Sequence, residues 1–101
     1  MNELIWSEKR TRCNWENAFK FAEELNKEKH LGRSDWRVPL RWELIRAYEE
    51  KVPGFGASWF WSSSGDEDNS NDAWYVSFYY GNADTNGKYS DEHVRCVSSG
   101  L

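Results

Sequence analysis

The sequence has few of the residues that most often reveal a protein's chemistry or location. It contains two cysteines, two prolines and one methionine among 101 residues. Two thiols are too few for a structural zinc site, which needs four ligands. No apolar run approaches the roughly 20 residues that cross a bilayer. The first residues also lack the basic and apolar segments of a secretion signal. We therefore expect no membrane insertion and a cytoplasmic or virion-associated protein, unless the chain is an excised domain of an exported protein.

An excess of positive charge is also lacking, since the formal net charge is −4. The richest basic stretch is Glu8–Arg12, which we interpret as a solvated surface segment. Proteins that bind nucleic acid usually present an extended basic face. The composition therefore predicts no nucleic-acid partner.

Aromatic residues are abundant, with seven Trp, five Tyr and five Phe. Each buried aromatic side chain removes about 150–250 Å² from water, so few aliphatic residues are needed for a core. A chain of 101 residues suffices for one domain and not for two. We expect a single domain over residues 1–101.

Two segments have helical periodicity. The first, about Trp15–His30, follows Asn14, whose side chain suits an N-cap, and Gly32 is a natural stop. The second, about Arg41–Glu50, follows Pro39, which holds Trp36–Val38 extended. The apolar positions predicted to be buried are Trp15, Ala18, Ala22 and Leu25 in the first helix, and Leu40, Leu44, Ala47 and Tyr48 in the second.

The rest of the chain is typical of short strands joined by polar loops. Strands are predicted at Glu3–Trp6, from Trp59, at Trp74–Phe78 and at Val94–Val97. Period two places Trp74, Val76 and Phe78 on one face, and Tyr75, Ser77 and Tyr79 outward. Ser62–Asn71 is predicted to be a loop, and Gly81–Ser90 a long hairpin connection that turns at Asn86-Gly87. The predicted fold class is α+β, with two helices packed on a small sheet.

Cys13 and Cys96 leave two alternatives open. A disulfide between them would close a loop of more than eighty residues and stabilise the fold by about 4 kcal/mol. The other alternative is a pair of buried free thiols, as in a reducing compartment.

Several short motifs occur in an order that resembles a known family. They are Trp15-Glu16-Asn17-Ala18, Asp35-Trp36-Arg37-Val38-Pro39, Glu43-Leu44, Trp61-Ser62-Ser63, Ala73-Trp74-Tyr75-Val76-Ser77-Phe78, Gly81 and Val94-Arg95-Cys96-Val97. In this order they are similar to the Lcl C-terminal domain family. The resemblance covers about Leu4 to Val97 and implies a C-type lectin-like fold, with two helices on a mostly antiparallel twisted sheet and paired termini. It further implies that a ligand is met on the loop-rich face, as in adhesion modules for glycans or host polymers.

The chain departs from the family pattern at two points. Leu40 replaces the family's Thr after the proline, which leaves Glu43 with half a capping box. The family's helix cysteine would fall near Ala22, whereas this chain has Cys13. The family disulfide therefore cannot be carried over to this sequence.

The candidate ligand-binding residues lie in two polar, partly aromatic loops. Tyr and Asn side chains are common in adaptable binding surfaces, although turns favour many of the same residues. The acidic loop lacks the spacing of an EF-hand, and we expect no metal and no cofactor. The ligand-binding candidates are Asp66, Asp68, Asn71, Asp72, Tyr79, Tyr80, Asn82, Asp84, Asn86 and Tyr89.

A second set of residues is predicted to have structural roles. The tryptophans are expected mainly in the core, and the arginines are expected to brace loops through carbonyl or carboxylate oxygens. The set consists of Trp15, Trp36, Arg37, Pro39, Glu43, Trp61, Trp74, Phe78, Arg95 and Cys96.

No catalytic pattern stands out. Ser62-Ser63-Ser64-Gly65 lacks the Gly-x-Ser-x-Gly turn of hydrolases, and neither His30 nor His93 belongs to a recognisable triad. We expect a non-enzymatic recognition module for a protein or glycan ligand, with its oligomeric state open. The alternatives are a small structural or assembly subunit, such as one encoded by a phage, and a calcium-dependent lectin.

Overall fold

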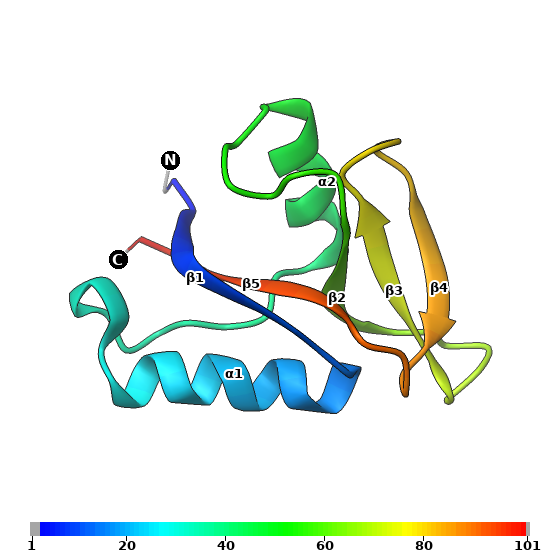
Figure 1. The fold of residues 1–101 in the computed structure, drawn as a ribbon, viewed down its shortest axis with the longest axis horizontal. Coiled ribbons are helices and arrows are strands. Elements are labelled where there is room, and N and C mark those ends of the chain that lie inside the picture. The colour runs from blue at the N-terminus through cyan, green and yellow to red at the C-terminus, as the bar shows by residue number, and fades with distance from the viewer. Residues whose placement is uncertain (1–2, 101) are drawn as a thin grey trace.

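The computed structural model describes residues 3–100 of the chain. Figure 1 shows a twisted sheet with one helix on each side. The elements, in chain order, are β1 (Ile5–Cys13), α1 (Trp15–Lys27), a short 3₁₀ turn η1 (His30–Gly32), α2 (Arg41–Glu49), β2 (Trp59–Gly65), β3 (Asp72–Ser77), β4 (Ala83–Gly87) and β5 (Glu92–Ser98). Neither helix of this described part has the length and hydrophobicity that crossing a membrane requires.

The five strands form one open sheet in the order β1-β5-β2-β3-β4. All neighbouring strands are antiparallel except β2 and β5, which are parallel. Ile5 lies opposite Ser98, so the two ends of the described chain pair with each other. The predicted α+β class, the mostly antiparallel sheet and the paired ends are confirmed.

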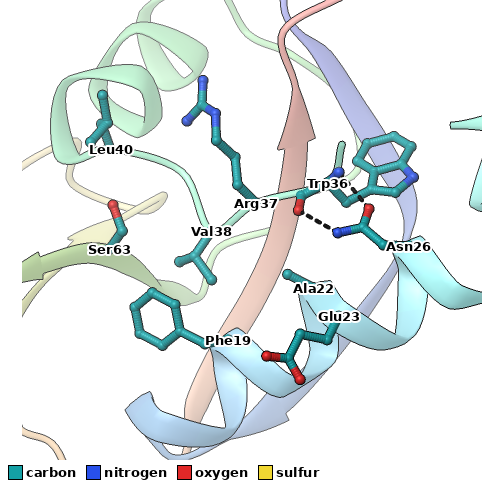
Figure 2. A pocket seen from close by; sticks show the side chains of 9 residues that line it. All are labelled: Phe19, Ala22, Glu23, Asn26, Trp36, Arg37, Val38, Leu40 and Ser63. Carbon is teal, nitrogen blue, oxygen red and sulfur yellow. Dashed lines mark hydrogen bonds between the residues drawn. The ribbon is translucent and has the colours of Figure 1, made fainter. Parts of the chain in front are cut away.

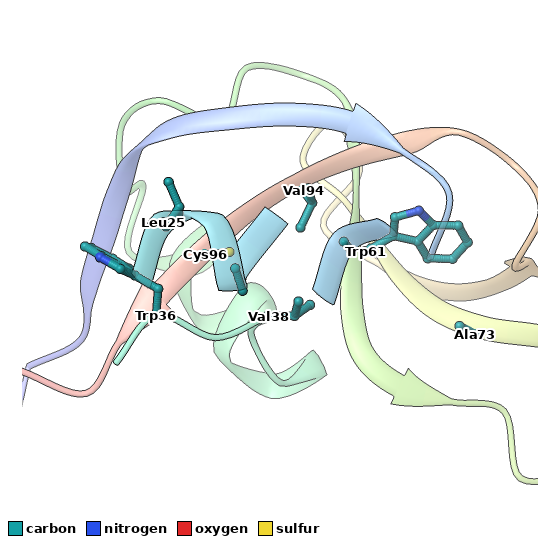
Figure 3. Close-up of a cluster of buried hydrophobic side chains, with 9 residues drawn as sticks. Leu25, Trp36, Val38, Trp61, Ala73, Val94 and Cys96 are labelled. Carbon is teal, nitrogen blue, oxygen red and sulfur yellow. The ribbon is translucent and has the colours of Figure 1, made fainter. Parts of the chain in front are cut away.

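Each face of the sheet has its own core. On the α1 face, Leu25 and Trp36 pack with sheet residues that include Trp61, Val94 and Cys96 (Figure 3). On the α2 face, a separate cluster joins Leu44, Ala47, Phe55, Phe60 and Val76. Because both faces are covered, this short chain buries aromatic side chains on both sides of a single sheet.

Helix α1 begins as its sequence predicts. The Asn17 N–H donates to Asn14 Oδ1 at 3.0 Å, which confirms the N-cap. The helix ends at Lys27, before the predicted His30. Lys29 and Leu31 have φ values of 50° and 53°, in the left-handed region, and these break the helix ahead of Gly32. The predicted C-terminal boundary of this helix was therefore wrong, because it relied on the preference for glycine at a helix end.

Helix α2 starts with the incomplete cap predicted from Leu40. The Leu40 N–H donates to Glu43 Oε1 at 2.8 Å, whereas the Leu40 side chain offers no acceptor in return. The Glu43 N–H instead donates to the Leu40 carbonyl at 3.0 Å. Half of the capping box is present, as expected, and Leu40 itself is exposed rather than part of the buried stripe.

Several strand and loop predictions were incomplete or wrong. The first strand continues to Cys13 and includes the mostly exposed Glu8–Arg12 stretch. Residues 62–65 were predicted as the start of a loop but belong to β2. Gly81–Ser90 is not one long connection, because Ala83–Gly87 forms β4 against β3. Asn86-Gly87 therefore lies at the end of a strand, and the turn follows it at Lys88 and Tyr89, where the Ser90 N–H donates to the Gly87 carbonyl at 3.0 Å. The chain reverses earlier, and the Ser77 N–H donates to the Asn82 carbonyl at 2.9 Å.

The predicted outward set on β3 was also wrong in part. Val76 and Phe78 pack in the α2-side cluster, as the period-two pattern implied. Tyr75, however, packs against the α1-side cluster, and Ser77 is buried. Tyr79 alone of that set is exposed. The pattern was misread because a strand covered on both faces has no solvent side.

The two cysteines are free thiols. Cys13 lies opposite Glu92, four residues along β5 from Cys96. Four residues of strand span about 13 Å, whereas a disulfide needs Cα atoms within about 7 Å. The fold therefore excludes a Cys13–Cys96 bridge and leaves the free-thiol alternative.

Candidate functional site

The predicted binding residues fall at opposite ends of the β3–β4 hairpin. Asp72 pairs with Gly87 at one end of the ladder, and Val76 pairs with Ala83 at the other. These ends are about 13 Å apart along the strand. Asp66, Asp68, Asn71, Asp72, Asn86 and Tyr89 lie toward the Asp72 end, and Tyr79, Tyr80 and Asn82 lie at the turn. The structure therefore brings Asn86 and Tyr89 beside the acidic loop, where the Lys88 N–H donates to the Asn71 carbonyl at 2.8 Å, and separates Tyr79, Tyr80 and Asn82 from it.

The turn that joins β3 to β4 presents two tyrosines. We call residues 78–82 the hairpin tip. The Tyr79 and Tyr80 side chains are 65% and 74% exposed, and their rings meet edge-on with centroids 4.7 Å apart. The backbone below them is fixed, because the Tyr79 and Tyr80 N–H groups both donate to Ser77 Oγ, at 3.1 and 3.0 Å.

Helix α2 and the start of β2 anchor the hairpin tip from behind. The Gly81 N–H donates to the Ser77 carbonyl at 2.8 Å, and the Phe78 N–H donates to the Ser58 carbonyl at 2.9 Å. Gly81 has a φ of 80°, and a Cβ built there would lie 2.3 Å from the Tyr48 ring. Only glycine fits this close approach without a shift of the ring or the backbone.

The acidic loop at the other end is held by its own backbone. Asp66 Oδ1 accepts a hydrogen bond from the Asp68 N–H at 2.9 Å, and Asn69 Oδ1 accepts one from the Asn71 N–H at 3.0 Å. The Lys88 ammonium donates to the Ser70 carbonyl at 2.7 Å. Among residues 3–100, no group of three or more His, Cys, Asp or Glu side chains is placed to hold a metal ion.

The remaining ligand candidates line the β4 side of the hairpin. Asn86 Nδ2 donates to Glu92 Oε2 at 3.0 Å, and Asp84 Oδ1 accepts from the Thr85 N–H at 2.8 Å. Tyr89 is 86% exposed, and its ring lies against Gly87, where a Cβ would come within 2.4 Å of it. Asn86 is therefore engaged within the chain, whereas Tyr89 presents most of its surface to solvent.

Arg37 and Glu43 form the most buried ion pair of the described residues. Arg37 Nη1 and Nη2 donate to Glu43 Oε1 and Oε2, both at 2.8 Å. Burial on its own raises the pKa of Glu43, but the Arg37 hydrogen bond, the Leu40 N–H and the Arg37 charge outweigh it and lower that pKa. This pair joins the Trp36–Pro39 segment to α2.

The tryptophan N–H groups bond to backbone carbonyls. Trp15, Trp36 and Trp61 donate through Nε1 to the carbonyls of Ser62, His30 and Cys13, at 2.8, 2.9 and 3.0 Å. The Trp74 ring lies under the Arg41 guanidinium, with Cζ 4.1 Å from the ring centroid. These indoles connect distant segments of the fold.

The other residues assigned structural roles also lie within the frame. Phe78 stacks on Phe55 with ring centroids 4.0 Å apart, and the Pro39 carbonyl accepts from the Ser63 N–H at 2.8 Å. Arg95 donates to the carbonyls of Ser7 and Pro53, at 2.6 and 2.7 Å. Burial, followed by the charge of the Cys13 thiol, raises the pKa of the Cys96 thiol to about 12, so Cys96 is a poor nucleophile at neutral pH.

Two surface hollows were not anticipated from the sequence. One, of about 510 Å³, lies between α1 and the Trp36–Pro39 segment, where Phe19, Ala22 and Val38 form an apolar floor (Figure 2). The other, of about 680 Å³, lies between α2 and the start of the chain and is lined by Trp6, Trp42 and Arg46, among others. Trp42 is 55% exposed. One indication of this surface was present in the sequence, because Trp42 lies outside the apolar stripe predicted for α2.

Comparison with known proteins gives one family. The model of the family described as the Lcl C-terminal domain matches residues 1–98. No curated protein matches the chain.

Proposed function

The chain belongs to the Lcl C-terminal domain family, and from this membership we propose that it is a non-enzymatic recognition module of C-type lectin-like fold. Its ligand is a protein or a glycan, bound at the hairpin tip. The observation that carries the proposal is the pair Tyr79 and Tyr80, which are largely exposed on a backbone held by hydrogen bonds to Ser77.

A rigid, exposed aromatic pair suits binding for a physical reason. Tyrosine offers a large contact area with few rotatable bonds, and it keeps a hydroxyl group for hydrogen bonds. Ordering a flexible loop on binding costs free energy for each side chain immobilised. The fixed turn and the packing of Gly81 against Tyr48 reduce that cost at the hairpin tip. The adjacent Asn82, also exposed, adds amide donors and acceptors.

The side chains that could act in catalysis form hydrogen bonds at separate places in the fold. Ser62 Oγ donates to the Trp74 carbonyl at 2.7 Å, and His30 Nε2 accepts from the Glu8 N–H at 3.1 Å. Glu92 accepts hydrogen bonds from Asn86 and Ser90. This arrangement supports recognition over catalysis, because a catalytic site needs a nucleophile or an acid–base pair that converges on one point.

The experiment is a binding screen with matched tyrosine variants. The purified chain is applied to a glycan array and to a panel of purified surface proteins, and Kd is measured for each hit. The variant Tyr79→Ala/Tyr80→Ala is expected to weaken binding by about 100-fold, on the order of 1–2 kcal/mol for each exposed aromatic anchor. Its melting temperature should stay close to that of the original chain, since both rings lie mainly in solvent.

Tyr89→Ala is the control, because Tyr89 is at least as exposed and lies at the other end of the hairpin. It should retain binding. Equal loss in both variants, or binding that survives removal of both tip tyrosines, would contradict the proposal. Loss of binding in EDTA would instead support the calcium-dependent lectin. A concentration-dependent oligomer in sedimentation, with no ligand found, would support the assembly subunit.

A further inference from the structure

The β1–β5 strand pair gathers four basic side chains on one face of the sheet. Arg10 lies directly opposite Arg95, and Arg12 lies opposite His93. Residues two apart in a strand share a face, so the two pairs form one cluster, which we call the basic block. Phe60 lies beneath it, 5.3 Å from the Arg10 guanidinium and 5.5 Å from the His93 ring.

No carboxylate among residues 3–100 forms an ion pair with the basic block. Lys9, Arg37 and Arg46 form ion pairs with Glu28, Glu43 and Glu50, and none of these carboxylates is paired with a member of the basic block. Arg10 and Arg95 each donate to backbone carbonyls only. Arg12 is exposed, and its side chain makes no hydrogen bond or ion pair with the described residues.

This arrangement is unfavourable in the chain alone. Arg10 and Arg95 carry like charges directly opposite each other, and such a pair destabilises an antiparallel sheet. Burial and the nearby Arg10 together lower the pKa of Arg95, which reflects the same strain on its charged form. Glu92, the nearest carboxylate in β5, is bound by Asn86 and Ser90. An anion placed over the basic block would relieve this repulsion.

The strand that carries two of these arginines is also an open edge. β1 is the first strand of the sheet order and pairs only with β5 among the described elements. Val97 exchanges both of its backbone hydrogen bonds with Arg37, on the side of β5 away from β1. Backbone groups alternate in direction along a strand, so Arg95 and His93 also point away from β1. Their partners Arg10 and Arg12 therefore direct N–H and C=O groups outward, to the open edge.

From these two features we infer that the β1 edge is a docking site for an extended acidic segment of a partner protein. The segment adds a strand beside Arg10–Arg12, and its carboxylates, spaced two residues apart, meet the guanidinium groups of Arg10 and Arg12. Edge addition of this kind takes its affinity from main-chain hydrogen bonds and its specificity from alternate side chains.

Charge selects this occupant over the alternatives. A second copy of the chain added at the same edge would set arginine against arginine, and charged edge strands are known to prevent such self-pairing. A long polyanion would extend beyond the small basic block onto a chain whose net charge is −4. A short acidic strand needs only the block and the edge. The open edge ends at Glu8, because its N–H already donates to His30 Nε2. This limits how many residues of a partner strand can pair with β1.

This site is independent of the hairpin tip. β1 and β4 are the two opposite edges of the five-stranded sheet, and the tip joins β3 to β4. The inference extends the proposed recognition function to a second surface, and either surface can fail in experiment without the other.

The test uses the full chain and a synthetic eight-residue peptide with Glu at every second position and Val between. Fluorescence anisotropy is expected to show binding that weakens with salt. Arg12→Gln should raise Kd by about three- to fivefold, and Arg12→Glu by about tenfold or more. Lys20→Gln and Lys20→Glu, on an exposed site of α1, make the same charge changes and should leave Kd unchanged. Tyr79→Ala/Tyr80→Ala should also leave it unchanged.

Two further measurements separate edge pairing from simple charge attraction. Hydrogen exchange should slow at the Arg10 and Arg12 amides when the peptide binds. A peptide of the same charge, N-methylated on the edge that faces β1, should bind at least tenfold more weakly, because it cannot complete the ladder. Equal binding of both peptides, unchanged exchange at these amides, or binding of dextran sulfate without binding of the peptide would overturn the inference.

Discussion

At the scale of single residues, the contact between Glu43 and Arg37 has the largest consequences. Glu43 is 2% exposed and accepts hydrogen bonds from both Arg37 and the Leu40 N–H. It therefore ties the start of α2 to the segment that bonds to β5. A carboxylate this buried is tolerated only when its charge is compensated. The Glu43–Arg37 pair should be more important for stability than either exposed ion pair.

We predict that Glu43→Ala destabilises the fold by about 2–3 kcal/mol, because Arg37 and the Leu40 N–H lose their acceptor. Arg37 is 38% exposed, and solvent screening keeps the cost below that of a fully buried pair. Glu50→Ala is the control, since Glu50 forms an exposed i,i+4 pair with Arg46. It should cost no more than about 0.5 kcal/mol. Urea denaturation at pH 7 measures both values.

The same variant gives a pH test. The pKa of Glu43 is lowered in the folded chain relative to its ordinary value of 4.5. Between that value and the folded pKa, the unfolded state binds more protons. The stability from this pair is therefore fully present above about pH 4.5 and is lost as pH falls through the folded pKa. The Glu43→Ala penalty should shrink over this acidic range. A penalty that stays constant down to pH 3 would contradict the assignment.

At the scale of elements, local signals specified the helices better than the sheet. Asn14 and the apolar spacing of α1 act within a few residues, and the prediction of that helix depended on nothing distant. β4 has no such signal, because Ala83, Asp84, Thr85, Asn86 and Gly87 include only one residue type that favours strands. It is a strand because β3 supplies a partner for it.

The same reasoning explains what was missed at the candidate site. Both polar loops were predicted to hold the ligand, but the β3–β4 register separates Tyr79, Tyr80 and Asn82 from the acidic loop and leaves Asn86 and Tyr89 near it. A register that arises from pairing could not be derived from Asn86-Gly87, which signals a turn in most hairpins. The basic block was missed for a similar reason. Arg95 and His93 meet Arg10 and Arg12 only through strands more than eighty residues apart in the chain.

The hairpin tip gives a prediction at this scale. Gly81→Ala should destabilise the fold by more than 2 kcal/mol, because the new methyl group would overlap the Tyr48 ring and the backbone has a φ of 80°. The anchor between α2 and the tip should loosen as well. Thermal and urea denaturation measure the loss.

Gly32→Ala is the matched control for that variant. Gly32 has a similar φ of 74°, but no atom lies within 4 Å of a Cβ built there. This change should cost only about 1 kcal/mol, from the backbone conformation alone. The difference between the two variants then reports the contact with Tyr48. Equal losses would show that this contact is unimportant.

At the scale of the whole molecule, one sheet separates two cores that share its strands. β2 contributes Trp61 to the α1-side cluster and Phe60 to the α2-side cluster, and β3 contributes Ala73 and Val76 in the same way. If one cluster lost its packing, the strands that it shares with the other cluster would be destabilised as well. The two proposed docking surfaces lie on this shared frame, at its opposite edges, and each depends on the sheet remaining intact.

We therefore predict that the chain unfolds in one transition. Leu25→Ala, on the α1 side, and Leu44→Ala, on the α2 side, both remove buried side chains and should each cost about 2–5 kcal/mol. Urea transitions followed by tryptophan fluorescence and by far-UV circular dichroism should coincide in the original chain and in both variants. The losses should add to within about 0.5 kcal/mol in the double variant, because the two leucines belong to separate clusters. Two separated transitions, with only one displaced by each variant, would show that the faces of the sheet unfold independently and that the frame is not shared.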